Sequence, residues 1–476
     1  MSRSTNAETR ENLRLTREQR AERGKALRAT VPRTRHAEFE PGPERPDPLA
    51  QLESEDTARL PELLPIRYGR MVGSPFTYFR GAALTMASDL AGTVDTGLTV
   101  QCCGDAHLSN FGLFGSPERR LVFDIDDFDE TLPGPWEWDV KRLAASMEIA
   151  ARNNDFPSGA RRKVVVATVA AYRRAMREFA GFTTLEVWYA HADVSMLRKR
   201  VEATLGGSRR KQLGQVMAKA QTRNHLGSLS RFAGVSNGEL RIIADPPLIV
   251  PADQLVEQGT DPAEVTQRMR KLLRSYRTSL EPERRVLLDR YRFVDLARKV
   301  VGVGSVGTRS WMLLMLGDDD RDPLFLQAKE AGTSVLEEFT KPSEFDNAGR
   351  RVVVGQRLMQ AVSDIFLGWV RVQAGTDGRS RDFYIRQLRD WKGSAEVETM
   401  VPAGMRAYGE LCGWTLARAH ARTGDRIAIA AYLGSGETFE KAVTEFAAAY
   451  ADQNERDYAA LVGAIRTGRI TAEPGK

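Results

Sequence analysis

Two short apolar segments, each running into acidic residues, constrain this chain more than any other feature of its sequence. Residues 98–103 (LTVQCC) lead into the loop GDAHLSN, and residues 120–125 (RLVFDI) lead into DDFDET. Apolar runs of this length beside turn residues predict buried strands. Helical periodicity covers much of the remaining chain, as in RRKVVVATVAAYRRAMREF at 161–179. The sequence therefore predicts an α+β fold in which acidic side chains gather at strand ends.

Those strand ends carry the residues best suited to chemistry. Asp105 and Asn110 lie on the first loop, and four more aspartates follow the second strand or end it. Neighbouring carboxylates repel one another unless a cation neutralises them, and Mg²⁺ prefers oxygen ligands of this kind. We therefore expect Asn110 to hold metal while Asp105 accepts a proton from, or orients, an attacking hydroxyl. A solvated acidic turn is the alternative.

The loop GDAHLSN resembles the catalytic loop H-G-D-x-H-x-x-N of the aminoglycoside phosphotransferase and choline kinase branch of the protein-kinase-like superfamily. In that branch an apolar strand, an Asp-Phe-Asp type metal motif and a further Asp at a helix start follow the loop. The resemblance implies that Asp105 is catalytic and that Asn110 and Asp127 bind Mg²⁺. Asp126 can exchange roles with Asp127, and Asp139 takes a position that braces the loop.

Two loop residues need separate treatment. Cys103 stands where that branch usually has its first histidine, so the geometry of the loop is in question more than its activity. His107 matches the second histidine. We include His107 among the catalytic candidates, although a buried, hydrogen-bonded role is the favoured one.

A glycine-rich segment far downstream has the features of a phosphate-binding hairpin. Residues 302–307 read GVGSVG and precede the apolar run RSWMLLML and an acidic turn. That pattern predicts a β-hairpin, because a dinucleotide-binding loop of this spacing would open a helix instead. The next strand, LFLQAKE, places Lys329 near its end, as the lysine strand of kinases does.

We expect this hairpin and Lys329 to bind ATP. Lys329 would contact the α and β phosphates, and the backbone of the loop would cover them through Gly302, Gly304, Ser305 and Gly307. An ordinary hairpin with a surface lysine is the alternative. Glu337 is our choice for the carboxylate partner of Lys329. The sequence leaves other choices open, namely Glu338, Glu344 and the neutral Gln356.

The order of these parts is unusual for a kinase, whose nucleotide lobe precedes the catalytic loop. Here the helical residues 60–95 precede it, and the segment LARAH (416–420), which resembles the helix before the catalytic strand, comes near the end. Rotating the start point of the chain restores kinase order. We therefore expect a circularly permuted, two-lobed protein-kinase-like fold, with a large helical lobe and a small antiparallel β-sheet lobe.

The chain as a whole also resembles the bacterial domain-of-unknown-function 2252 family. The segments that carry this resemblance are RYGRM, SPFTYFRGAA, CGDAHLSNFG, FDETLPGPWEWD and VVGVGSVGTR. They span nearly everything after the N-terminal arm, and the family implies no established substrate.

At 476 residues the chain is long enough for more than one domain. We expect a mobile N-terminal arm at 1–46, a helical lobe with the catalytic loop and metal site at 47–290, a nucleotide-binding β lobe at 291–400, and C-terminal helices at 401–476 that complete the helical lobe.

Two other functions compete with phosphoryl transfer from ATP. A metal-dependent phosphoesterase also uses G-D-x-H, but it builds a two-metal site from several histidines, and this chain has only five. A non-catalytic nucleotide-binding scaffold is the second alternative. Degenerate relatives of that kind usually lose a key residue, whereas Asp105, Asn110, Asp127 and Lys329 are all present.

Charge and composition narrow the partners. The net charge is +6, but the basic residues alternate with acidic ones along helices, so nucleic acid is not an expected partner. No apolar run could cross a membrane, no signal-peptide core begins the chain, and the three cysteines form no disulfide framework. We expect a cytoplasmic protein whose acceptor is a small molecule, with a protein acceptor left open and the oligomeric state undetermined. Arg80 is a candidate for lining the cleft.

Overall fold

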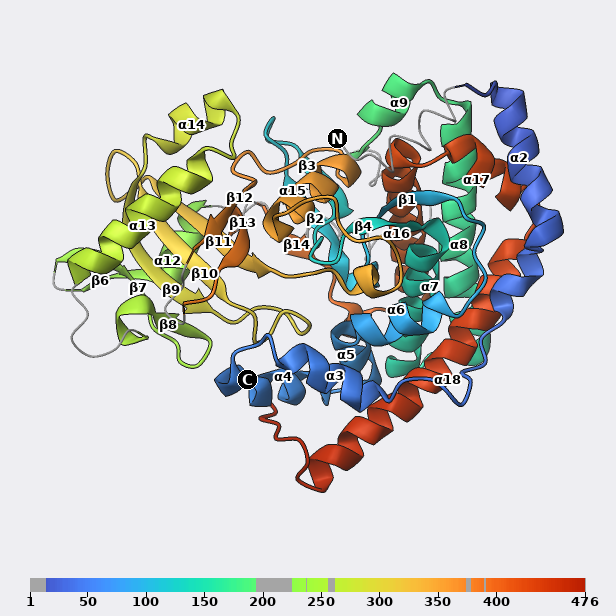
Figure 1. Ribbon diagram of the computed structural model, residues 1–476, viewed down its shortest axis with the longest axis horizontal. Coiled ribbons are helices and arrows are strands. Elements are labelled where there is room, and N and C mark those ends of the chain that lie inside the picture. The colour runs from blue at the N-terminus through green and yellow to red at the C-terminus, as the bar shows by residue number, and fades with distance from the viewer. Residues whose placement is uncertain are drawn as a thin grey trace.

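The computed structural model describes residues 14–193, 225–236, 238–255, 262–373, 378–388 and 391–475. These residues form a mixed helix-and-sheet protein with two lobes (Figure 1). One lobe is a six-stranded antiparallel sheet that carries short helices, and the other consists mainly of long helices. Two of the smaller sheets lie between the two lobes, and the third lies at the far end of the sheet lobe. None of the helices in these residues is long and apolar enough to cross a membrane.

The helical lobe packs its longest helices around one large hydrophobic core. Its helices are α2 (Arg17–Thr30), α3 (Pro48–Asp56), α4 (Leu64–Met71), α5 (Pro75–Gly81), α6 (Ala83–Ala91), α7 (Trp136–Asn153), α8 (Ser158–Gly181), α9 (Thr184–Tyr189), α16 (Pro402–Thr423), α17 (Arg426–Leu433) and α18 (Thr438–Arg466). Helices α16 and α8 lie along each other, and α7 and α18 pack beside them.

Helix α7 crosses the middle of this lobe and is almost wholly buried, although it carries several charged side chains. Burying a charged group is costly unless it is paired or hydrogen-bonded. The α7 side chains meet that condition. Glu137, for example, accepts from the backbone amide of Thr96 at 2.9 Å. The same helix places Asp139 and Arg142 beneath the loop GDAHLSN.

Two small antiparallel sheets present the acidic segments. Strand β1 (Thr99–Cys102) pairs with β4 (Leu132–Pro135). Strands β2 (Phe111–Gly115) and β3 (Leu121–Ile125) form a hairpin flanked by β14 (Gly393–Ser394) and β5 (Ala192–Asp193). The loop after β1 and the segment after β3 lie side by side, because the amide of Asp126 donates to the carbonyl of Asn110 at 2.9 Å.

The six-stranded sheet has the order β12-β13-β11-β10-β9-β8. Its strands are β8 (Ile249–Pro251), β9 (Arg292–Lys299), β10 (Ser310–Leu316), β11 (Pro323–Ala331), β12 (Gly368–Val372) and β13 (Arg381–Gln387). The central strand β10 reads as one continuous apolar run because both of its faces are covered. Leu313 and Met315 face one core cluster, and Met312 and Leu314 face another.

Short elements cover that sheet and connect the lobes. The helices are α12 (His225–Phe232), α13 (Pro262–Arg277), α14 (Pro282–Leu288) and α15 (Ala348–Met359), and β6 (Ala233–Ser236) and β7 (Glu239–Ile242) form a separate hairpin. The 3₁₀ helices are η1 (Arg33–Ala37), η2 (Pro61–Leu63), η3 (Leu108–Asn110), η4 (Ala252–Gln254), η5 (Val335–Glu338) and η6 (Val397–Thr399).

The structure shifts both ends of the expected β lobe at 291–400. Strand β8 pairs with β9, and Tyr276 of α13 and Leu280 just after this helix enter the core under the sheet, so the lobe begins before residue 291. At the other end, β14 pairs with β2 in the sheet of the other lobe. Residues 194–224, which belong to the helical lobe expected at 47–290, lie outside the described residues.

The expected mobile arm at 1–46 is helical but not free over the residues that the structure describes. Helix α2 lies against α17, where Arg20 forms an ion pair with Asp425 at 2.7 Å. His36 is buried, and Arg45 bridges Asp89 and Asp457. These buried contacts make residues 14–46 part of the helical lobe. Composition alone could not reveal them, because the arm is rich in polar side chains that here find fixed partners.

Candidate active site

The loop after β1 is built on a glycine that no other residue could replace. Gly104 has φ +83°, and a Cβ there would lie 2.3 Å from the carbonyl oxygen of Glu130. Asp139 of α7 fixes the same turn, because its carboxylate accepts from the amides of Cys103 at 2.6 Å and Gly104 at 3.0 Å. His420 of α16 lies 3.1 Å from that carboxylate. The bracing position expected for Asp139 is therefore what its hydrogen bonds provide.

Asp105 lies on this braced loop and contacts two basic side chains. Arg142 donates to its Oδ1 at 2.5 Å, and His107 Nε2 stands 3.6 Å from its Oδ2. About a fifth of the Asp105 side chain is exposed, at 19%. One carboxylate oxygen is thus held by a fixed guanidinium, and the other remains available to a ligand.

His107 is buried under the loop. Burial lowers the pKa of His107 to about 3, although Asp105 acts in the opposite direction, so the imidazole is neutral at neutral pH. Its Nδ1 is buried without a hydrogen-bond partner in the described part of the chain. A neutral imidazole beside Asp105 supports the position of the loop, and it lacks the charge that an electrostatic catalyst would need.

Asn110 and Asp127, the expected metal ligands, lie on the two neighbouring segments. The side-chain amide of Asn110 donates to the backbone carbonyl of Asp105 at 2.8 Å, which leaves its own carbonyl oxygen turned to other partners. Asp127 keeps 29% of its side-chain surface. Asp126 differs from both, since its carboxylate lies 3.2 Å from the ammonium of Lys392.

Lys329 reaches the acidic segment from the other lobe. Its Nζ lies 2.6 Å from Oδ2 of Asp129 and 3.8 Å from Oδ1 of Asp127. The hydroxyl of Tyr384, on the neighbouring strand β13, donates to Asp129 at 2.7 Å, and Ser305 of the glycine-rich loop reaches the same carboxylate at 3.3 Å. Residues about two hundred positions apart in the chain therefore converge on Asp129.

The charges of this cluster are unevenly compensated. Burial favours the neutral acid at Asp129, but Lys329 outweighs it and lowers the pKa of that carboxyl. Burial and the repulsion of Asp129 raise the pKa of Asp127 instead. Burial also opposes the charge on Lys329, yet Asp127 and Asp129 raise the pKa of its ammonium. An additional cation beside Asp127 would relieve the repulsion between the two aspartates.

The structure corrects the expected partner of Lys329. Glu337 does not pair with the lysine. Its two oxygens accept from the amides of Ser334 at 3.1 Å and Ser343 at 2.8 Å, which close the short helix η5. Asp129 takes the place expected for Glu337. The helix after the lysine strand, α15, contributes Arg351 instead, which donates to the backbone carbonyl of Asp129 at 2.8 Å.

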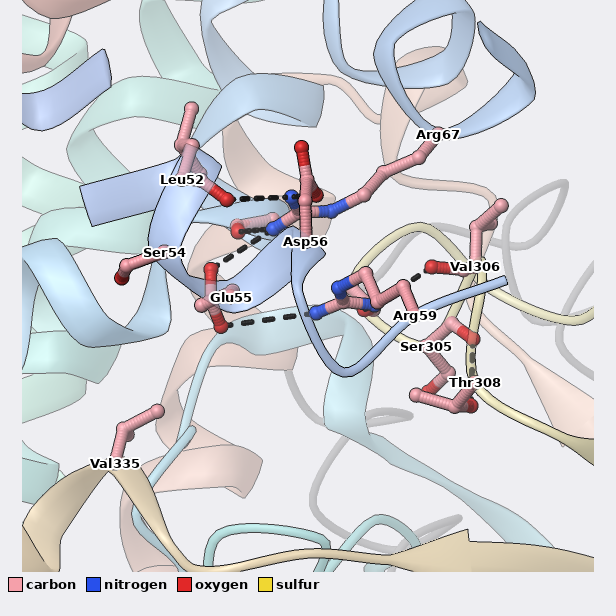
Figure 2. Close-up of polar contacts among 12 residues, drawn as sticks. Leu52, Ser54, Glu55, Asp56, Arg59, Arg67, Ser305, Val306, Thr308 and Val335 are labelled. Carbon is pink, nitrogen blue, oxygen red and sulfur yellow. Dashed lines mark hydrogen bonds and ion pairs between the residues drawn. The ribbon is translucent and has the colours of Figure 1, made fainter. Parts of the chain in front are cut away.

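The glycine-rich loop at 301–309 joins the antiparallel strands β9 and β10, so the expected hairpin is confirmed. Figure 2 shows Arg59 reaching into this loop from the connection after α3. Its guanidinium donates to the carbonyls of Gly304 at 2.7 Å and Val306 at 2.6 Å. Burial and the neighbouring Arg67 lower the pKa of Arg59 to about 10, so it remains charged at neutral pH. The loop is therefore held from outside through its carbonyls.

Four backbone amides of the same loop differ from its carbonyls in having no partner in the described part of the chain. Within the described residues, no hydrogen bond is donated by the backbone amides of Gly302, Gly304, Ser305 and Gly307. Unused amides on a glycine-rich turn are a common means of binding oxyanions. Carbonyl oxygens of the loop thus bind Arg59, whereas these four backbone amides have no hydrogen-bond partner among the described residues.

A comparison with family models finds a match that covers most of the chain. The sequence model of a family described as an uncharacterized protein conserved in bacteria (DUF2252) matches residues 59–464. The chain belongs to this family. Comparison with curated proteins and with solved structures finds no match. The family assignment covers both the loop at Asp105 and the strand of Lys329, and it names no activity.

Asn110 and Asp127 are the metal ligands that the sequence of this DUF2252 family member predicts. Among the described residues, no three histidine, cysteine, aspartate or glutamate side chains are arranged to hold a metal. Asn110 and Asp127 together offer two oxygens, and Mg²⁺ commonly takes one or two protein ligands and keeps its waters. Two such oxygens do not by themselves form a closed structural metal site.

Several residues of the site escaped the sequence reasoning. Arg142 lies one turn after Asp139 on α7, and Tyr384 lies on β13 directly opposite Lys329. Neither stands in a motif with a distinctive spacing. Asp129 was visible in the sequence. The pairing of β11 with β13 places Lys329 opposite Tyr384, and only the packing of the two lobes brings both side chains to Asp129. Arg80 was noticed, and the structure places it at the end of α5.

Proposed function

We propose that this protein is a Mg²⁺-requiring phosphotransferase that moves the terminal phosphoryl group of ATP to a hydroxyl of a small-molecule acceptor. The observation that carries the proposal is the 2.6 Å contact of Lys329 with Asp129, two residues after the expected metal ligand Asp127. A lysine from the nucleotide side is thereby brought to the acidic segment. A protein acceptor is compatible with the same site.

The order of parts in the sheet lobe supports this proposal. A glycine-rich hairpin comes first, a lysine follows on the third strand, and a helix follows the lysine strand. Protein kinases build their phosphate-binding half from these parts in this order. The unused amides of the glycine-rich loop suit the phosphates that such a loop covers.

The proposal includes a circular permutation of the kinase-like fold. In an unpermuted chain, the helix resembling α16 would lead directly into the catalytic strand β1. In this protein α16 ends at Thr423, whose hydroxyl accepts from the amide of Gln101 in β1 at 3.0 Å. The end of α16 and the start of β1 therefore touch, although they are more than three hundred residues apart in sequence. Such closeness is what makes a permuted connection feasible.

The residues around Asp105 suggest how the transfer would proceed. Asp105 would accept the proton of the acceptor hydroxyl through the carboxylate oxygen that Arg142 does not hold. The hydroxyl oxygen of the acceptor would attack the γ-phosphorus as the bond between that phosphorus and the β–γ bridging oxygen breaks, and ADP would leave. Bound ATP and Mg²⁺ would supply the phosphoryl group and neutralise its charge. Lys329 and the loop amides would hold the remaining phosphates. Arg142, bonded to both Asp105 and the carbonyl of Phe79, keeps the base aligned.

Arg80 completes the proposed site. Its guanidinium makes no hydrogen bond with any described residue, and its Nε is buried. A Cβ at Gly304 would lie 3.1 Å from its carbonyl oxygen, so the end of α5 abuts the glycine-rich loop. Burial lowers the pKa of Arg80, while Asp105 and Asp127 oppose that shift. A half-buried cation near both aspartates suits the transferred phosphoryl group or an anionic acceptor.

ATP turnover in Mg²⁺ tests the proposal without knowledge of the acceptor, because kinase-like sites also pass the phosphoryl group slowly to water. Asp105→Asn should lower turnover by about 10²- to 10⁴-fold, the usual contribution of a positioned base. Its affinity for ATP should stay close to that of the wild type. Transfer of labelled phosphate from ATP to a pool of cell metabolites would then reveal the acceptor.

The matched control is Asp320→Asn, an exposed aspartate in the turn between β10 and β11 that should leave turnover unchanged. Wild-type protein that binds ATP but never turns it over would support the non-catalytic scaffold instead. Equal turnover in Asp105→Asn and wild type would exclude Asp105 as the base. Release of phosphate from simple esters without ATP would favour the phosphoesterase.

A further inference from the structure

A cavity of about 510 Å³ lies in the helical lobe, lined by α2, α8 and the end of α17. These three helices stand together at one edge of the molecule (Figure 1). Four of its lining side chains are cationic, namely Lys25, Arg28, Arg33 and Arg177, and none of its lining residues is acidic. Cavities of this size are typical of sites for small molecules.

Part of the positive charge is used to cap α17. Arg28 donates to the carbonyl of Tyr432 at 2.9 Å, and Arg33 donates to that of Leu433 at 2.7 Å. The last carbonyls of a helix carry a partial negative charge equivalent to about half an electron. That partial charge is much smaller than the total positive charge of the four cationic side chains. Burial, and secondly the nearness of Arg33, lowers the pKa of Arg28.

The other two cations are held only loosely. Arg177 donates to the carbonyl of Gly434 at 3.3 Å and makes no ion pair with a described residue, and Lys25 has no hydrogen bond or ion pair with any of them. Both side chains are exposed and reach the cavity from opposite helices, α2 and α8. A glycine next to the cavity leaves room for the guanidinium groups of Arg28 and Arg33. Gly434 has φ +71°, and a Cβ there would lie 2.7 Å from Arg28 Nη2 and 2.9 Å from Arg33 Nη1.

We propose that this cavity binds a small, multiply charged phosphate compound. Guanidinium groups match the oxygens of phosphate with paired hydrogen bonds, and an ammonium adds a point charge. No aromatic side chain lines the cavity, so recognition rests on charge and not on stacking with a base. The site is separate from the loop at Asp105 and does not depend on the proposed phosphoryl transfer.

The position of α17 connects this cavity with the catalytic strand. The cavity lies at the C-terminal end of α17, and the N-terminal end begins after Gly424. A Cβ at Gly424 would lie 2.5 Å from Cγ1 of Val100 and 3.0 Å from the carbonyl oxygen of Thr99, both in β1. A short, rigid helix therefore spans from the cationic cavity to the strand that carries the loop of Asp105.

Calorimetric titration with pyrophosphate, without metal and at low salt, tests this site. The protein should carry Lys329→Met, so that the proposed nucleotide cleft does not contribute. Lys25→Ala combined with Arg177→Ala should then weaken pyrophosphate binding by at least about tenfold, since each charge-assisted contact is worth roughly that factor. These two side chains support no buried contact, so the variant should fold. Arg174→Ala, an exposed arginine of α8 outside the cavity, is the matched control.

A second variant guards against a trivial loss of structure. Ser435→Glu places a carboxylate in the cavity, and it should abolish pyrophosphate binding while raising the thermal midpoint in the absence of ligand. Affinity should rise from phosphate to pyrophosphate to tripolyphosphate and fall with added salt. Equal pyrophosphate affinity with and without the Lys25 and Arg177 substitutions would overturn the inference. Loss of all binding through Lys329→Met alone would also overturn it, because the anion would then sit in the cleft.

Discussion

The acidic segment that ends β3 places its carboxylates in two different surroundings. Below the cleft, Asp124 is buried, bonds to Arg418, and accepts from the amides of Ile125 and Ala361, each at 2.9 Å. Three residues later, Asp127 keeps 29% of its side-chain surface and has its nearest ammonium, that of Lys329, at 3.8 Å. We call the buried group, made of Asp124, Asp139 and their partners, the floor. We call the partly exposed group, made of Asp127, Asp129 and Lys329, the cleft.

The hydrogen-bond partners of these carboxylates distinguish structural residues from candidate site residues more clearly than their pKa shifts do. Burial raises the pKa of both Asp124 and Asp127, so the direction of the shift does not distinguish them. What distinguishes them is how many fixed donors each carboxylate already has. In the floor, Asp124 binds a buried guanidinium and backbone amides, which the fold holds in place. In the cleft the nearest ammonium lies 3.8 Å from Asp127, and a ligand can reach the exposed part of that carboxylate.

The largest effect should come from breaking the floor. Arg418→Met leaves the buried Asp124 without its guanidinium, and removing one partner of a buried ion pair costs about 3–5 kcal/mol. The free energy of unfolding from urea titration measures this loss. Arg406→Met, an exposed position on the same helix, should change stability by less than about 1 kcal/mol. Equal losses in the two variants would remove the distinction between floor and surface.

A second test uses pH, because one acid of the floor region is incompletely satisfied. Glu137 accepts from Thr96, but its second oxygen has no partner among the described residues, and burial raises the pKa of Glu137 to about 7. A carboxyl whose pKa is higher in the folded state stabilises the fold below pH 4.5, and that contribution is lost as the pH rises toward 7. Glu137→Gln does not titrate. Relative to wild type it should gain about 1.4 kcal/mol per pH unit across that window, roughly 3 kcal/mol in total.

Urea unfolding of both proteins at pH 5 and pH 7.5 measures that difference. Lys141 and Asp95 face the same carboxyl and are unchanged in the variant. Glu445→Gln, at an exposed position of α18, should show no such trend. A stability difference that is constant with pH would mean that Glu137 is ionised in the fold at pH 5.

The smallest loss of stability should come from the cleft. Lys329→Met removes the main counter-charge of Asp129, but Tyr384 still donates to that carboxylate and 28% of it is exposed. We expect a cost of about 1–3 kcal/mol in unfolding free energy, together with ATP binding weakened by about tenfold or more. Lys341→Met, an exposed lysine, should change neither. A loss as large as that of Arg418→Met would make Lys329 part of the support.

Individual elements show how far local sequence determines this fold. The strands at 99–102 and 121–125, the hairpin around the glycine-rich loop and the helices of the last ninety residues follow from their apolar patterns. Strand β4 does not, because Leu132–Pro135 contains two prolines and a glycine, which argue against a strand. It forms a strand because β1 offers it an open edge, where missing amides cost little.

The sequence by itself determined which residue types gather at the two acidic strand ends, because a short loop can place Asp105 and Asn110 in only a few ways. It also determined the hairpin that carries Ser305 and the strand that carries Lys329. Only the tertiary structure decided that Lys329 meets Asp129 and not Glu337. A contact across two hundred residues depends on how the sheet lobe seats against the other lobe. No periodicity or motif in the sequence predicts how the two lobes pack against each other.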